Sequence, residues 1–101
     1  MTVERYLQAL SDKDETTLLE LTCPEHEFDA LLEFDALAQV QTVLKDVSCQ
    51  QVGADGDTAL IRCSGSIVSN YGGELFSYDL TGRTYQVIAD EDRLLVCGYT
   101  R

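Results

Sequence analysis

The first forty residues have the spacing of apolar side chains that is typical of helices. One set recurs at intervals of three and four residues and so lies on one helical face: Val3, Tyr6, Leu7 and Leu10. The polar run 11–14 ends this pattern. A second short helix is expected from Thr17 to Leu21, with Asp14 as its N-cap.

A third helix is expected after Pro24, the only proline of the chain. Proline suits the first turn of a helix because its missing N–H has no helical partner there. The residue before a proline avoids helical geometry, so Cys23 is expected to be extended. The side chains of this helix expected to face inward are Phe28, Leu31, Leu32 and Leu37.

From about Val40 the apolar residues alternate, which is the period of a strand with one buried face. Turn-forming residues divide this region at Asp55-Gly56-Asp57, Tyr71-Gly72-Gly73 and Asp90-Glu91-Asp92. This predicts a four-stranded antiparallel meander whose long third strand has a bulge at Gly82. The residues expected on the inward face are Val43, Val47, Cys49, Ala59, Ile61, Cys63, Ile67, Phe76, Tyr78, Leu80, Tyr85, Val87, Ala89, Leu95, Cys97 and Tyr99.

The apolar stripes of the helices and the apolar face of the sheet must cover each other. The chain has 101 residues, of which 45% are hydrophobic, and this is enough for one core but not two. The sequence therefore predicts a single α+β domain over residues 1–101. Its N-terminal helices pack in a curved four-stranded antiparallel sheet.

Four cysteines in a small acidic chain, Cys23, Cys49, Cys63 and Cys97, indicate two disulfides. Cys49 and Cys63 are symmetric about Gly56, so they face each other if their segments pair as a hairpin. Cys23 and Cys97 then form the second bridge. The spacing leaves the other two connectivities open.

Disulfides are typical of an oxidising compartment, but the segment Met1–Arg5 does not have the character of a secretory signal. We expect an extracytoplasmic protein, either secreted or held by a lipoprotein anchor, whose leader has been removed. The alternative is a cytosolic protein with four reduced cysteines, most of them buried as small hydrophobic residues.

The net charge of the chain limits the classes of partner that it can bind. Seven basic and eighteen acidic residues give a net charge of −11, which argues against nucleic acid and anionic membrane surfaces. No apolar run has the length of a membrane span. A basic partner or a cation remains open, and the simpler interpretation is a charge that keeps the protein soluble.

Several segments resemble the nuclear transport factor 2-like (cystatin-like) superfold: Tyr6–Leu10, Leu18–Cys23, Asp46–Cys49, Gly56–Leu60, Cys63–Gly65 and Val96–Tyr99. The chain is most similar to small bacterial extracytoplasmic and lipoprotein-type domains of that superfold, to which no function is assigned. The resemblance implies a cone of helices and curved sheet. These segments are scaffold residues, and the superfold hosts both enzymes and binding modules.

Enzymes of this superfold use polar side chains inside the cone. The residues that could line such a pocket are Tyr6, Tyr78, Tyr85 and Tyr99. The alternative is that these tyrosines are core rings with hydroxyl groups at the rim. His26, the only histidine, lies beside carboxylates and could act as a general base, or it could face solvent in the first turn of a helix.

Glu25, Asp29 and Glu33 recur every four residues and form an acidic stripe on the third helix. A cation or a basic partner would relieve their mutual repulsion, although a solvated face explains the stripe equally simply. The cysteines lack the spacing of zinc or redox motifs. We therefore expect no catalytic residue, metal site or cofactor.

Two functions follow as hypotheses. The first is a noncatalytic extracytoplasmic module that binds a small molecule or a protein. The alternative is a small enzyme of the isomerase or dehydratase type that uses the cone pocket. The outward face of the sheet also carries many aliphatic residues, which favours a homodimer over a monomer. These residues are Leu44, Val52, Leu60, Val68, Ile88, Leu94 and Val96.

Overall fold

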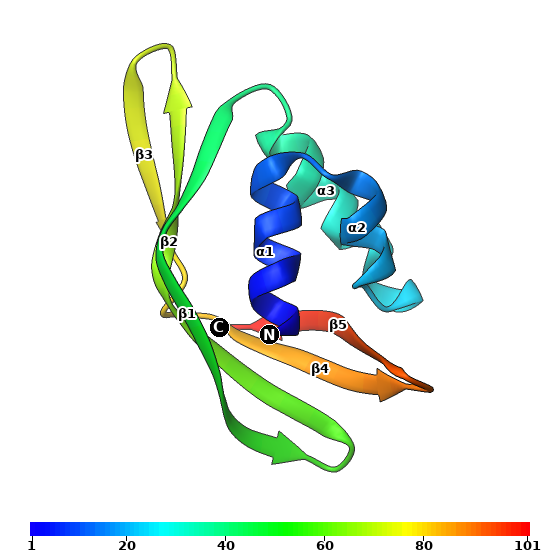
Figure 1. Ribbon diagram of the computed structural model, residues 1–101. Helices are drawn as coiled ribbons and strands as arrows, with labels where there is room; N and C mark the ends of the chain where they lie inside the picture. Colours follow the sequence, from blue (N-terminus) through cyan, green and yellow to red (C-terminus); the bar gives the residue numbers. More distant parts are fainter.

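The computed structural model describes all residues, 1–101, and has an α+β fold with three α-helices on a five-stranded antiparallel sheet. The helical elements are α1 (Thr2–Asp12), α2 (Glu15–Glu20), the 3-10 helix η1 (Pro24–His26) and α3 (Glu27–Leu37). The strands are β1 (Gln41–Asp55), β2 (Thr58–Tyr71), β3 (Glu74–Asp79), β4 (Thr84–Asp90) and β5 (Arg93–Thr100). The sheet is strongly bent, and the helices lie inside the bend (Figure 1).

The long strand β2 is the central strand of the sheet. It pairs with β1 along one edge and with both β3 and β4 along the other. The expectation of four strands is wrong, because a turn splits the expected third strand into β3 and β4. In that turn the N–H of Leu80 donates to Gly65 O and the N–H of Arg83 donates to Leu80 O, both at 3.1 Å. The two strands follow different halves of β2, which lets the sheet bend.

A bulge in β1 changes which side chains face the helices. Pairing with β2 shifts between Lys45 and Ser48, and Asp46 takes a positive φ of 56°. Gly65 lies opposite, where a Cβ would come within 2.5 Å of the carbonyl oxygen of Asp46, so only glycine fits. The bulge reverses the alternation before it: Leu44 packs against the core, and Val43, expected inward, is 60% exposed.

Another bulge lies in β5. Gln86 pairs with Gly98 and Val87 with Val96, so Cys97 is the extra residue. Val96, expected on the outer face, is therefore fully buried in the core. Leu95 is also buried, but it pairs with Ile88 and lies outside the main core cluster.

The apolar face of α1 is the centre of the core, as its spacing predicts. Val3, Tyr6, Leu7 and Leu10 are all fully buried. In α3 the buried residues are Ala30 and Leu37, whereas Phe28 is 74% exposed and Leu32 is 53% exposed. The prediction for these two side chains is wrong because α3 is apolar on several sides, so spacing alone does not select the buried one.

Both expected disulfides are present. Cys49 and Cys63 are paired residues of the β1–β2 hairpin, with Cα atoms 4.0 Å apart. Cys23 is bonded to Cys97 across 74 residues of chain.

Backbone hydrogen bonds reinforce the bridge to β5. Cys23 N–H donates to Val96 O, and Val96 N–H donates to Leu21 O. Disulfide and backbone bonds together fix η1 and the start of α3 beside β5. No helix is both long and apolar enough to cross a membrane.

Candidate functional site

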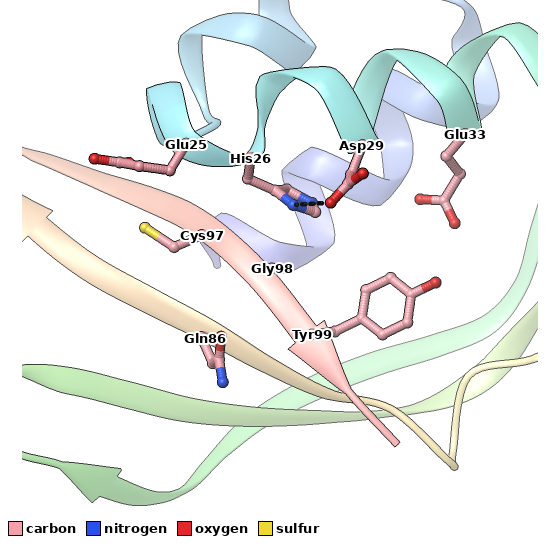
Figure 2. A pocket seen from close by; sticks show the side chains of 8 residues that line it. All are labelled: Glu25, His26, Asp29, Glu33, Gln86, Cys97, Gly98 and Tyr99. Atoms are coloured by element: carbon pink, nitrogen blue, oxygen red, sulfur yellow. Dashed lines mark ion pairs between the residues drawn. The ribbon is translucent and has the colours of Figure 1, made fainter.

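A polar cleft of about 550 Å³ lies between the first half of α3 and the end of β5 (Figure 2). It is lined by Glu25, His26, Asp29, Glu33, Gln86, Cys97, Gly98 and Tyr99. The acidic stripe predicted from the sequence therefore faces this cleft, and its carboxylates make the cleft strongly negative. We call it the acidic cleft.

His26 is the least exposed polar side chain of the acidic cleft. Its place in the first turn of a helix allows a side chain that faces solvent, yet it is only 8% exposed. Its Nε2 lies 3.3 Å from the hydroxyl of Tyr6, and its Nδ1 lies 3.9 Å from Asp29 Oδ2. Gly98, with a φ of 134°, brings the β5 backbone against the ring, so a Cβ there would lie 3.6 Å from Nδ1. Figure 2 shows Asp29 and His26 pointing toward each other above β5.

The hydroxyl of Tyr6 is buried beside His26. Burial, together with the negative charge of Glu33, raises the pKa of the Tyr6 hydroxyl well above its ordinary value. Tyr6 therefore stays protonated, and its hydroxyl shares a hydrogen bond with His26 Nε2.

A second buried polar group lies deeper, where Arg83 joins α3 to the sheet. Its Nη1 donates to Tyr85 Oη at 2.9 Å and to Glu33 Oε2 at 3.2 Å. Burial opposes the charge, but Tyr85 and Glu33 outweigh it and raise the pKa of the Arg83 guanidinium. Burial also raises the pKa of Tyr85 to about 12, against the opposing effect of Arg83.

A second cleft of about 390 Å³ adjoins the first and shares Glu33 and Tyr99 with it. Its walls are mostly apolar, formed by Leu32, Glu33, Ala36, Leu37, Ile67, Tyr71, Tyr78, Arg83, Tyr99 and Arg101. We call it the apolar cleft. It lies between the second half of α3 and the inner face of β2 and β3.

Three of the four tyrosines predicted to line a pocket are neighbours. The ring of Tyr85 lies 6.2 Å from that of Tyr6 and 5.3 Å from that of Tyr99. Tyr6 and Tyr85 are fully buried beneath the clefts and do not line them. Tyr99 lines both clefts. Tyr78 lies on β3, lines the apolar cleft, and its hydroxyl is 3.1 Å from that of Tyr71.

Sequence reasoning missed Arg83, the residue that organises the deeper group. It follows the turn residue Gly82, which marks it as a loop position, and its partner Glu33 lies 50 residues away. The sequence carries no local signal for such a pair.

No group of three or more histidine, cysteine or acidic side chains is arranged to hold a metal ion. No protein-family model matches the chain, and no curated protein matches it either. The geometry of the two clefts is therefore the basis for assigning a function.

Proposed function

We propose that the protein is a noncatalytic binding module that holds a small ligand between α3 and the sheet. The observation that carries this proposal is the pair of adjoining clefts, about 550 and 390 Å³, which share Glu33 and Tyr99. Volumes of this size accommodate small organic molecules. One cleft is polar and the other apolar, so together they offer both orientation and contact area.

Two contacts hold the walls of the site together. The Cys23–Cys97 disulfide fixes the chain just before η1 to β5, and the Glu33–Arg83 pair fixes the middle of α3 to the sheet. A preformed site loses little conformational entropy when a ligand binds. These constraints favour a binding role for the clefts.

An enzyme of the isomerase or dehydratase type is the second candidate, because His26 contacts both a carboxylate and a tyrosine. A general base needs a nitrogen within hydrogen-bond reach of the proton that it removes. Here Nε2 is bonded to the Tyr6 hydroxyl, Nδ1 lies 3.9 Å from Asp29 Oδ2, and the side chain is 9% exposed. Because Nε2 is engaged inside the protein and little of the ring is exposed, binding without catalysis is the better supported proposal.

We place this module outside the cytoplasm and within the nuclear transport factor 2-like superfold. Two disulfides in 101 residues support an oxidising compartment. A bent antiparallel sheet with helices inside the bend supports the cone architecture (Figure 1).

Association of two copies through the outer face of the sheet remains a prediction, with a changed set of residues. Leu44 and Val96 belong to the core side, and Leu94 pairs with Ala89 on the inner face. Val43 takes the place of Leu44 on the outer face because of the bulge in β1. The aliphatic residues on that face that are at least partly exposed are Val43, Val52, Leu60, Val68 and Ile88.

A fragment screen by ligand-observed NMR tests the binding role, with Ala36→Trp as the blocking variant. Ala36 lines the apolar cleft and is exposed, so an indole there fills the cleft without disturbing the core. Ala38→Trp, two residues along and outside both clefts, is the matched control. Fragments that bind the wild type and Ala38→Trp but not Ala36→Trp support the proposal. Fragments that bind all three proteins equally, or no bound fragment at all, contradict it.

A further inference from the structure

We propose that the apolar cleft takes a small organic acid, a molecule with a planar apolar body and one anionic group, whose anion is held by Arg83 and Arg101. This inference rests on the proposed binding function and names the chemical class of its ligand. It depends on the charge, the unused hydrogen-bond donors and the aromatic walls of the cleft.

The side chains that line the apolar cleft favour a ligand with a planar apolar part. Tyr71, Tyr78 and Tyr99 present ring surfaces, while Leu32 and Ile67 supply aliphatic contacts. Three of these side chains are partly open to solvent, with Leu32 53%, Tyr71 38% and Tyr78 39% exposed. A planar apolar group would cover this surface and stack against the rings.

The charge of the apolar cleft is opposite to that of the rest of the chain. The protein has seven basic against eighteen acidic residues, yet this cleft has two arginines, Arg83 and Arg101, and one acid, Glu33. Both guanidinium groups lie against the ring of Tyr99, with Cζ 4.4 Å from its centroid for Arg83 and 5.9 Å for Arg101. The adjoining acidic cleft has three carboxylates and no arginine or lysine. An anion is therefore favoured in the apolar cleft and disfavoured in its neighbour.

Arg83 keeps donors that the protein does not use. Both N–H bonds of its Nη1 are occupied, by Tyr85 and by Glu33. Its Nη2 and Nε make no hydrogen bond within the protein, and neither is among the fully buried atoms that lack a partner. These nitrogens therefore keep some solvent exposure, and Arg83 lines the apolar cleft. A guanidinium edge with two free nitrogens matches the oxygens of a carboxylate, sulfonate or phosphate.

The test compares two fluorescent probes that have the same rings and differ in one charge. Anilinonaphthalene sulfonate carries an anionic group, and phenylnaphthylamine is the same ring system without it. We expect the wild-type protein to bind the sulfonate about tenfold more tightly, because charge-assisted bonds to a guanidinium are formed only by the anion. Equal affinity for the two probes would overturn the inference.

Substitution of single arginines tests which of them causes the preference for the sulfonate. Arg101→Gln should weaken the sulfonate roughly three- to tenfold, within the range of one charge-assisted bond, and leave phenylnaphthylamine unchanged. Arg62→Gln is the matched control, because Arg62 is exposed on the outer face and lines neither cleft. Sulfonate binding that is insensitive to Arg101→Gln, or equally sensitive to Arg62→Gln, contradicts the inference.

The Nε–Hε resonance of Arg83 in the wild-type protein gives a readout that needs no substitution at this buried site. It should shift by more when the sulfonate is bound than when phenylnaphthylamine is bound, because only the sulfonate accepts a hydrogen bond from this group. The two proposals fail in different ways. If both probes bind equally and Ala36→Trp blocks both, the cleft binds ligands but does not select anions. If neither probe binds the wild type, both proposals are contradicted.

Discussion

Glu33 on α3 and Arg83 before β4 form the one ion pair between a helix and the sheet. Their Oε2 and Nη1 atoms are 3.2 Å apart, and the side chains are 20% and 9% exposed. Arg83 also donates to Tyr85, so a single guanidinium connects the helix, the sheet and the aromatic cluster. This pair forms part of the wall between the two clefts.

Removal of the Arg83 guanidinium should destabilise the protein more than removal of the charge of Glu33. Arg83→Met leaves Glu33 and the Tyr85 hydroxyl without their donor, and we expect a loss of about 3 kcal/mol in the free energy of unfolding. Glu33→Gln keeps an acceptor oxygen and should cost about 1–2 kcal/mol. Arg62→Met, at an exposed arginine, should change stability by less than about 0.5 kcal/mol. Urea unfolding measures all three, and equal losses for Arg83→Met and Arg62→Met would contradict this description.

The two disulfides should differ in their contribution to stability. In the chain-entropy model the Cys23–Cys97 bridge, which spans 74 residues, contributes about 4.5 kcal/mol. The Cys49–Cys63 bridge spans 14 residues and contributes about 3 kcal/mol. Unfolding of the two double serine variants gives the order. A larger loss for the hairpin bridge would show that loop length does not control the effect here.

Stability should fall at alkaline pH because of the buried tyrosines. The ordinary pKa of a tyrosine is 10.0, and burial raises that of Tyr85 in the folded protein to about 12. Tyr85 thus stabilises the fold fully below pH 10, and its contribution is lost as the pH rises from 10 to 12. Tyr6 acts in the same direction, since its pKa is also raised.

Urea unfolding as a function of pH, with Tyr85→Phe as the variant, measures this effect. The variant should lose stability less steeply between pH 10 and 12, by up to about 1.4 kcal/mol per pH unit. Tyr78→Phe is the control, because Tyr78 is exposed and its pKa is lowered by the bond with Tyr71. The same alkaline slope in Tyr85→Phe and wild type would rule out Tyr85 as a source.

The elements with strong local signals could be predicted from the sequence. The α1 face follows from spacing, the hairpins from turn residues, and the Cys49–Cys63 pair from symmetry about Gly56. The bulges at Asp46 and Cys97 could not be predicted, because the residue at each position gives no local signal for a bulge. Asp46 takes a positive φ that aspartate adopts only occasionally, and Cys97 is held out of register beside its disulfide.

The candidate site could be predicted only in part. Tyrosines at alternating positions indicated an aromatic cluster, but their depth depends on how the sheet bends. Burial of His26 requires the Cys23–Cys97 bridge and the close approach of Gly98, which are contacts between distant segments. The partners of Arg83 are likewise fixed by tertiary packing rather than by local sequence.

The molecular mass in solution of the wild type and of two variants tests self-association through the outer face. We predict a mass near twice the 11.2 kDa of one chain for the wild type at micromolar concentration. Val43→Asp should give a monomer because Val43 is 60% exposed on that face. Leu94→Asp, at an exposed leucine on the inner face, should remain a dimer. Light scattering that reports 11.2 kDa for the wild type at every concentration would contradict the prediction.

The central claim is that a ligand binds between α3 and the sheet. The most direct test is a ¹H–¹⁵N spectrum of the full chain during titration with anilinonaphthalene sulfonate. We predict that the shifted amides cluster in residues 32–37 of α3, in β2 from Ile67 to Tyr71 and at the end of β5 around Tyr99. Shifts confined to the outer face around Val43 and Val68, or the absence of any shift at saturating probe, would contradict the account.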